Sequence, residues 1–179
     1  MNPPHEVVAF WRKAGAGKWF NGGEAFDREC LRFLDAHHAT ARREHAHWQD
    51  TAEGLVALLI LLDQIPRNIF RGSGHAFATD GLALHYARCA VARGMDLQVD
   101  ADLRAFVYLP FEHSEVLADQ HEAVRLFRTL GNAEYDRYAL AHLDVIERFG
   151  RFPHRNQALA RVSTPEELAY LQAGGGYAQ

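Results

Sequence analysis

The sequence predicts an all-α protein, a stack of antiparallel helical hairpins that forms a single domain over residues 1–179. Three observations support this fold. Apolar residues recur at helical spacing along most of the chain, no segment alternates as a β-strand does, and short turns separate segments of roughly 10–20 residues. With 48% hydrophobic and 23% charged residues, the chain has the composition of a globular domain that buries one core.

The first half is expected to contain a central buried helix. We expect a short helix over residues 6–14, a loop over 15–23 and a long helix over 24–48. Asp50 or the hydroxyl of Thr51 can cap the next helix. The run 55–62 is apolar on every side, which is typical of a buried helix, and a buried strand is the alternative for so short a run.

The second half is expected to consist of helices with recognisable ends. A glycine turn over 72–74 precedes them, Gly94 ends the first, Pro110 ends the second and Ser114 caps the third. The segment Thr164–Glu167 has the hydroxyl, proline and glutamate of a capped helix start. The expected helices cover 75–93, 100 or 102 to 109, 115–130 and 133–149, and the expected frayed tail covers 174–179.

Composition limits the function classes. The formal charge of −4 argues against nucleic acid or an anionic membrane as the main partner. Cys30 and Cys89 lie in helical patterns without a C-x-x-C spacing, so we expect free thiols in a reducing compartment. The first residues lack the basic and apolar regions of a signal peptide, which predicts a cytoplasmic location. The sequence does not decide between a monomer and a homo-oligomer.

The most informative feature is a phrase that occurs twice in variant form. Residues Asp63–Arg71, the first proline corner, and Arg148–Asn156, the second proline corner, each follow an apolar helical stretch. Each then introduces a proline together with arginine and asparagine. Because a proline should break the helix and leave backbone groups unpaired, polar side chains at these positions must supply hydrogen bonds.

Three polar clusters are therefore candidates for a site, and we expect them to converge with Trp19 on one cleft. Guanidinium and amide groups that converge can hold a carboxylate or phosphate, so the leading prediction is a pocket for a small anion. The alternative is a buried ion-pair network that binds nothing. The candidates are Trp19; Asp63, Gln64, Arg67, Asn68 and Arg71; Glu112, His113, Glu115 and Asp119; His142; and Arg148, Arg151, His154, Arg155 and Asn156.

Two further functions remain open. His113 oriented by Glu115 could serve as an acid or base in a hydrolase or lyase. A peptide-binding or oligomerising scaffold would instead show an exposed apolar groove. The chain has only one E-x-x-H, at Glu44–His47, so we predict no metal. It also lacks glycine-rich phosphate loops, and no cofactor is expected.

Several of these phrases resemble one bacterial family. The matching segments include Leu62–Gly72, Ala76–Asp80, Leu109–Glu115, Arg148–Asn156 and Ser163–Glu167, together with the Trp19–Phe20 pair and His142. The chain is similar in these segments to the family called domain of unknown function 924. Isoleucine at position 65 and alanine at position 160 depart from the family's usual phenylalanine and glycine. The resemblance implies a tetratricopeptide-like helical fold and no established reaction, substrate or cofactor.

Overall fold

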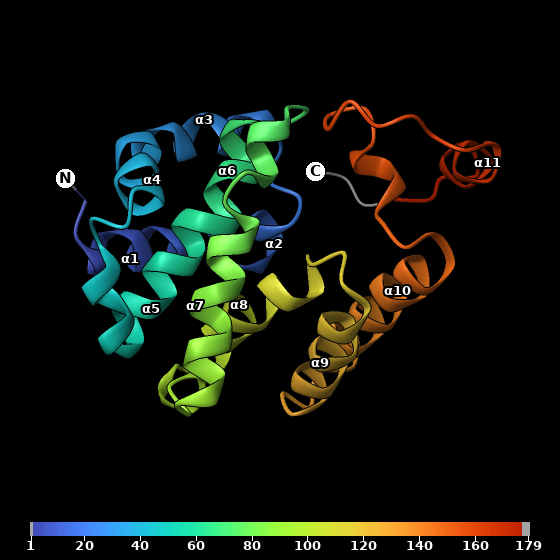
Figure 1. The fold of residues 1–179 in the computed structure, drawn as a ribbon. Helices are drawn as coiled ribbons and strands as arrows, with labels where there is room; N and C mark the ends of the chain where they lie inside the picture. Colours follow the sequence, from blue (N-terminus) through green and yellow to red (C-terminus); the bar gives the residue numbers. More distant parts are fainter. Residues whose placement is uncertain (1, 177–179) are drawn as a thin grey trace.

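The computed structural model describes residues 2–176, and these residues form helices connected by turns, without a β-strand (Figure 1). The all-α prediction is confirmed; the tetratricopeptide-like stacking of the hairpins stays a prediction. Residues 177–179 of the expected frayed tail lie outside the described part. The α-helices are α1 (Pro4–Ala14), α2 (Ala16–Trp19), α3 (Gly23–Cys30), α4 (Leu34–Ala41), α5 (Ala52–Leu59), α6 (Ile65–Ile69), α7 (Asp80–Ala92), α8 (Ala101–Glu112), α9 (Leu117–Arg128), α10 (Ala133–Phe149) and α11 (Pro165–Gln172).

The helix expected over 24–48 is interrupted. It consists of α3, the 3₁₀ turn η1 (Leu31–Phe33) and α4, and it ends at Ala41. Arg43 follows in the left-handed region at φ 65°, which stops helical propagation. A second 3₁₀ turn, η2 (Ala46–Asp50), then leads to α5, and the predicted cap is present because Thr51 Oγ1 accepts a hydrogen bond from Gly54 N.

The first proline corner does not break its helix, contrary to the expectation from sequence. The helical path runs from α5 through a π-helical turn, η3 (Ile60–Gln64), into α6, with Pro66 in the first turn of α6. The widened turn shifts the backbone pairing by one residue, so that Ile65 N donates to Ile60 O. The chain therefore continues past the proline without the hydrogen bond that its missing N–H would have made.

Side chains satisfy the carbonyl groups that the π-helical turn and Pro66 leave free. Thr79 Oγ1 donates to Leu62 O at 2.5 Å, which is the carbonyl that a residue other than proline at position 66 would have paired. The Nδ1 of His37 donates to Leu61 O at 2.8 Å. Arg67 and Asn68 donate in the same way to the carbonyls of residues 63 and 64, at 2.6 and 2.9 Å. Part of the polar content of this corner is therefore structural.

Three expected helix boundaries in the second half are also corrected. The helix α8 includes Pro110 and ends only at Glu112. Val116, not Ser114, is the N-cap residue of α9, although Ser114 Oγ accepts from Val116 N at 3.2 Å. The first helix after the glycine turn begins at Asp80, because a 3₁₀ turn, η4 (Gly74–Phe77), occupies the segment before it.

The capped helices follow their predictions closely. Asn132 caps α10, which covers the predicted 133–149, and Gly150 ends it in the left-handed conformation at φ 67°. The second proline corner leaves α10 through Gly150 into a 3₁₀ turn, η6 (Pro153–Arg155). Thr164 and Glu167 form the predicted capping box of α11.

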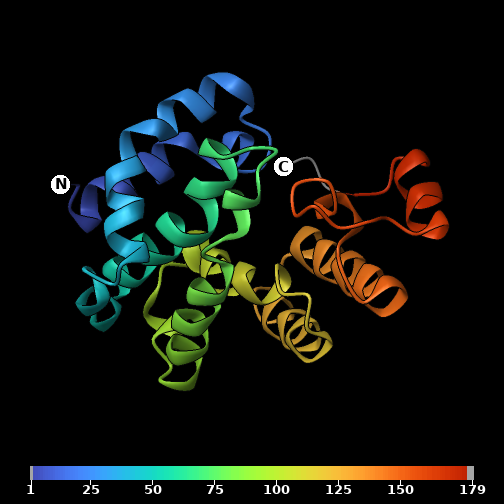
Figure 2. The same cartoon turned by 45° about the horizontal axis from the view of Figure 1, so that its top comes forward.

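The core surrounds α5 and η3. Residues 55–62 are buried throughout, which confirms the central helix, and the largest buried rings near them include Trp11 and Phe106. A second, small cluster of Val145, Ile146 and Phe152 lies under the second proline corner. Figures 1 and 2 show α9 and α10 as a hairpin beside α8, with α11 at the C-terminal edge.

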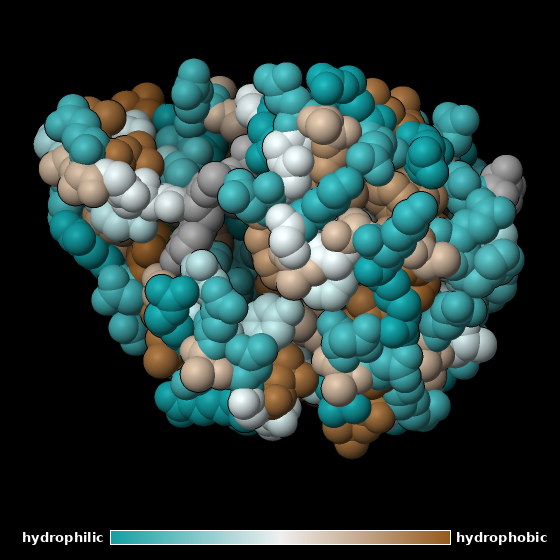
Figure 3. All heavy atoms as spheres, turned by 180° about the vertical axis from the view of Figure 1, so that it is seen from behind, coloured by the Kyte–Doolittle hydropathy of each residue, from teal (hydrophilic) through white to brown (hydrophobic). Residues whose placement is uncertain are grey.

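Two surface properties bear on function. None of the helices in residues 2–176 has the length and hydrophobicity that spanning a lipid bilayer requires. On the face shown in Figure 3, hydrophobic side chains occur in small groups that hydrophilic side chains interrupt. A continuous apolar groove, which the scaffold alternative predicts, is not seen on that face.

Candidate functional site

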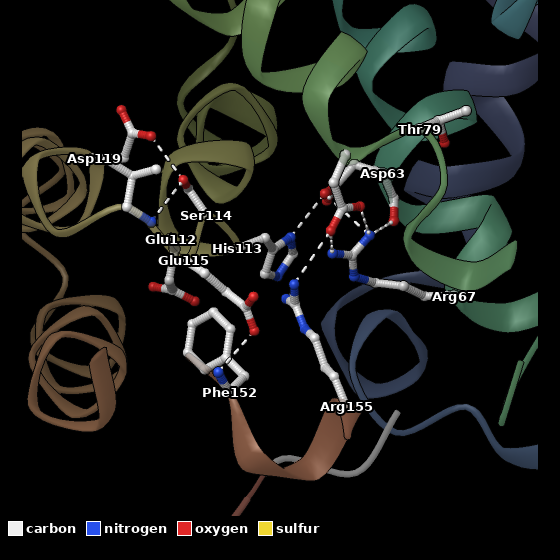
Figure 4. Close-up of polar contacts among 12 residues, drawn as sticks. Asp63, Arg67, Thr79, Glu112, His113, Ser114, Glu115, Asp119, Phe152 and Arg155 are labelled. Atoms are coloured by element: carbon white, nitrogen blue, oxygen red, sulfur yellow. Dashed lines mark hydrogen bonds and ion pairs between the residues drawn. The ribbon is translucent and has the colours of Figure 1, made fainter. Parts of the chain in front are cut away.

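Asp63 is the centre of a buried polar network between the two proline corners (Figure 4). Its carboxylate is almost fully buried at the end of η3, where it accepts from His113 Nδ1 at 2.7 Å and from Gln64 Nε2 at 2.6 Å. Burial alone would raise the pKa of Asp63, but the charge of Arg67 and the hydrogen bonds hold it well below its usual range. Asp63 is therefore an anion that fixes the orientation of His113.

Asp80 joins the two proline corners. Arg67 of the first corner binds it through both terminal nitrogens, at 2.8 and 2.9 Å. Arg155 of the second corner approaches the same carboxylate at 3.4 Å, and its guanidinium lies between the rings of Phe77 and Phe152, 4.7 and 4.6 Å from their centroids. The corners that the sequence predicted to converge do meet at this point.

Arg155 is the most weakly paired cation of this network. It is 4% exposed, its Nε has no hydrogen-bond partner among the described residues, and its contact with Asp80 is long. Burial and the neighbouring charge of Arg67 lower the pKa of Arg155 to about 10. A buried cation with this little compensation would gain from an additional anion.

A neutral pair lies behind the network, between α8 and α10. Burial, with the charge of Asp63, raises the pKa of Glu112 to about 8, so Glu112 is protonated at neutral pH. Its Oε1 lies 3.4 Å from Nδ1 of His142, which donates to Tyr138 O at 2.8 Å. Burial lowers the pKa of His142 to about 3, so this imidazole is neutral as well.

Glu115 does not orient His113, contrary to the enzyme prediction from sequence. It accepts two hydrogen bonds from Arg161, at 2.7 and 2.9 Å, and a third from the backbone N of Phe152 at 2.8 Å. Arg161 also donates to Phe152 O at 3.0 Å. Glu115 thus fastens the second proline corner to the start of α9, and Asp63 takes the orienting role.

Three other polar side chains of the second proline corner bind carboxylates of α11. Arg151 pairs with the buried Glu167 at 2.6 and 2.8 Å, and Asn156 donates to the same carboxylate at 3.2 Å. Arg148 pairs on the surface with Glu166 at 2.9 Å. These three residues fit the ion-pair interpretation, because each binds a carboxylate of α11.

A cavity of about 190 Å³ lies between the two proline corners. Arg67, Arg71 and His154 supply its polar wall, and Phe77 is one of its apolar lining residues. No acidic residue is among its lining residues. Arg71 pairs with Asp27 outside the cavity through Nε and Nη2, at 2.8 and 2.9 Å.

Three predicted site residues lie elsewhere. Trp19 donates to Trp11 O at 2.7 Å and packs on Phe106, so it belongs to the N-terminal core. Asp119 pairs with Arg88 and accepts from Ser114 Oγ at 2.7 Å. Asn68 caps the backbone of the π-helical turn, as described above. The predicted convergence of all three clusters with Trp19 is therefore only partial.

Sequence reasoning missed three charged residues that organise the region. Asp80 joins the corners, Arg161 holds Glu115, and Glu167 receives Arg151. Asp80 and Glu167 stand inside segments that carry the family resemblance, so that signal was available. Arg161 follows Ala160, a position at which the family usually has glycine, so the resemblance extended to this part of the chain as well.

The comparisons with known proteins agree with the fold. The family model described as "Bacterial protein of unknown function (DUF924)" matches residues 7–175. The chain belongs to the DUF924 family. A solved structure, that of the protein of unknown function ATU0120 from Agrobacterium tumefaciens, is 50% identical and has a TM-score of 0.92. The match covers 96% of this chain and 97% of the other, and no curated protein matches.

Proposed function

We propose that this DUF924 protein binds a small anion, a molecule with a phosphate or carboxylate group, in the cavity between its proline corners. The cavity itself is the observation that supports the proposal. Its lining residues include two arginines and a histidine and no acidic residue. Its volume of about 190 Å³ suits a compact ligand, below the range typical of drug-sized molecules.

Donor groups remain available at this cavity. The Nε of Arg67 is buried and has no partner among the described residues, although its terminal nitrogens bind Asp80. Arg71 uses Nε and Nη2 for Asp27, and its Nη1 makes no hydrogen bond to a described residue. Burial and Arg155 lower the pKa of His154 to about 3. A bound anion would offset the smaller of these two causes, the positive charge of Arg155 beside the imidazole.

The experiment is a thermal-shift titration with inorganic phosphate and small carboxylates. Ligand at ten times its Kd should stabilise the protein by about 1.4 kcal/mol, which corresponds to about 3–6 °C for a chain of this size. Arg71→Gln should remove the shift. Arg148→Gln is the matched control, because Arg148 is also a half-exposed arginine in an ion pair but does not line the cavity.

Equal shifts in the wild type and Arg71→Gln would contradict the proposal, since they would report a general effect of ions. If Arg71→Gln lowers the melting temperature and no anion shifts the wild type, the result would favour the network interpretation. In that interpretation Arg67 and Arg71 only hold Asp80 and Asp27 in place.

A second candidate function is an enzyme that uses His113, as a hydrolase or lyase. The Asp63–His113 hydrogen bond of 2.7 Å favours it. Because Nδ1 donates to Asp63, and burial and Arg67 lower the pKa of His113, Nε2 carries a lone pair at neutral pH. Asp63→Asn should then lower any activity found, while Glu115→Gln should act only through stability.

The remaining expectations form part of the same proposal. A cytoplasmic location suits Cys30 and Cys89, which are free, and burial raises the pKa of Cys30 to about 12. We propose a small anion as partner, without nucleic acid, membrane or cofactor, and leave a homo-oligomer open. Anaerobic thiol titration of the protein purified from cells should find both cysteines reduced; a mixed disulfide would contradict this location.

A further inference from the structure

A larger hollow lies at the N-terminal helices, separate from the cavity between the proline corners. It is a groove of about 510 Å³ between α1 and the segment around η1, and it shares no lining residue with the other cavity. Its volume is in the range of small-molecule sites. The segments that line it lie within residues 2–33, which are drawn in blue in Figures 1 and 2.

Aromatic rings supply the apolar wall of this groove. Phe10 of α1 packs edge-on against Phe33, with ring centroids 4.9 Å apart, and it stacks on Phe26 at 5.6 Å. Ala9 and Ala14 extend the apolar surface along α1. Because these rings hold one another in place, an aromatic ligand would meet a fixed surface that suits ring contacts.

Cations without an ionic partner border the same wall. The only two lysines of the chain, Lys13 and Lys18, both line the groove. Lys18 pairs with Glu29 at 3.2 Å. Lys13 and Arg32 make no ion pair or hydrogen bond with any residue from 2 to 176.

The guanidinium of Arg32 is already positioned for a ligand. It lies over the ring of Phe10, 5.4 Å from the centroid. This cation–π contact restricts the side chain and leaves its N–H edges available, so that less conformational entropy is lost when a carboxylate binds. Glu6, the one acidic lining residue outside the Lys18–Glu29 pair, accepts from Asn2 Nδ2 at 3.1 Å.

We propose that this groove binds a small carboxylate with an aromatic body. The carboxylate lies between Arg32 and Lys13, and the ring packs on the wall formed by Phe10. A neutral aromatic compound would leave both cations without a partner, and inorganic phosphate would leave the apolar wall unused. The combination of features therefore selects an amphipathic acid, whether or not an anion binds between the proline corners.

The test uses 3-phenylpropionate as the probe, titrated into the full chain and followed by backbone amide shifts in NMR spectra. We expect saturable shifts at residues 9–14 and 29–33 at millimolar concentrations, and weak or no saturation with the neutral analogue 3-phenylpropan-1-ol. Arg32→Gln should weaken binding about tenfold, the loss of one charge-assisted hydrogen bond. Arg28→Gln is the matched control, because Arg28 is an exposed arginine of α3 that pairs with Glu24 at 3.7 Å outside the groove.

Three results would overturn the proposal. Shifts that do not saturate, or that are the same with the alcohol, would show that the carboxylate is not recognised. Equal affinity of the wild type and Arg32→Gln would remove the role of the guanidinium. Shifts confined to 67–77 and 154–158 would place the acid in the cavity between the proline corners and would leave the groove without a ligand.

Discussion

The substitution Glu112→Gln should make the protein more stable, by an amount that grows with pH. Glu112 is buried beside His142, and its pKa is raised from 4.5 to about 8. In the unfolded chain the carboxyl ionises near its usual pKa, whereas the folded protein must keep it protonated. The stability that the protonated carboxyl of Glu112 contributes is therefore fully present below pH 4.5 and is lost as the pH rises through 8.

The magnitude follows from the difference between the two pKa values. Keeping Glu112 neutral costs under about 1 kcal/mol at pH 5, about 3 kcal/mol at pH 7 and about 4 kcal/mol at pH 8. Glutamine has the same shape, keeps an oxygen acceptor for His142 and has no proton to lose. Any fixed cost of its amide group is the same at every pH, so the pH-dependent part isolates the ionisation.

Urea unfolding of the wild type and Glu112→Gln at pH 5, 6, 7 and 8 measures this difference. The stability of the variant relative to the wild type should rise by about 2–3 kcal/mol between pH 5 and pH 7. The ionisable groups that interact with Glu112 are the same in both proteins, so they do not contribute to the difference; they are Asp63, Tyr135 and His142. Parallel curves of stability against pH would refute the account, because they would show that Glu112 ionises normally when folded.

Three further predictions concern stability. Thr79→Val should cost about 1–3 kcal/mol in urea unfolding, because the buried carbonyl of Leu62 loses its donor; an unchanged midpoint would contradict this role. Ala160→Gly should stabilise the chain by up to about 1 kcal/mol, since Ala160 has φ 52° and glycine adopts that conformation without strain; a lower melting temperature would count against it. His142 and His154 have pKa values lowered to about 3, so the folded state keeps them neutral while the unfolded state binds protons below about pH 6.5. Each histidine should therefore lower the free energy of unfolding by about 2 kcal/mol between pH 7 and pH 5. His142→Gln should abolish the loss that His142 causes. An equal loss of stability in acid in the wild type and this variant would show that His142 does not cause it.

Helix ends that depend on local chemistry could be predicted from sequence. Thr164 accepts a hydrogen bond from the backbone N–H three residues along the chain, so its capping effect is contained in the local sequence. Asn132 caps α10 in the same local way, although only the bounds of that helix were predicted. Pro66 was misjudged because its effect depends on a distant residue. The helix continues past Pro66 because the free carbonyl of Leu62 accepts a hydrogen bond from the hydroxyl of Thr79. A local sequence pattern cannot show this contact between distant residues.

The candidate site was predictable in its composition and not in its pairing. The meeting of the proline corners through Arg67 and Arg155 agrees with the expectation of convergence. Which carboxylate each arginine binds depends on tertiary packing, and for Arg151 the partner is Glu167 of a helix that packs on the corner. Residue type therefore identified the region, while three-dimensional contacts decided which donors stay available to a ligand.

The most direct test of anion binding is a crystal of the wild-type protein soaked in tungstate, a phosphate analogue whose tungsten atom is located by anomalous scattering. We expect one anomalous peak in the cavity between the proline corners, within hydrogen-bonding reach of Arg67, Arg71 and His154. A crystal of Arg71→Gln treated in the same way should show a much weaker peak. No peak in this cavity at saturating tungstate, or an equal peak in the variant, would show that the cavity is not an anion site.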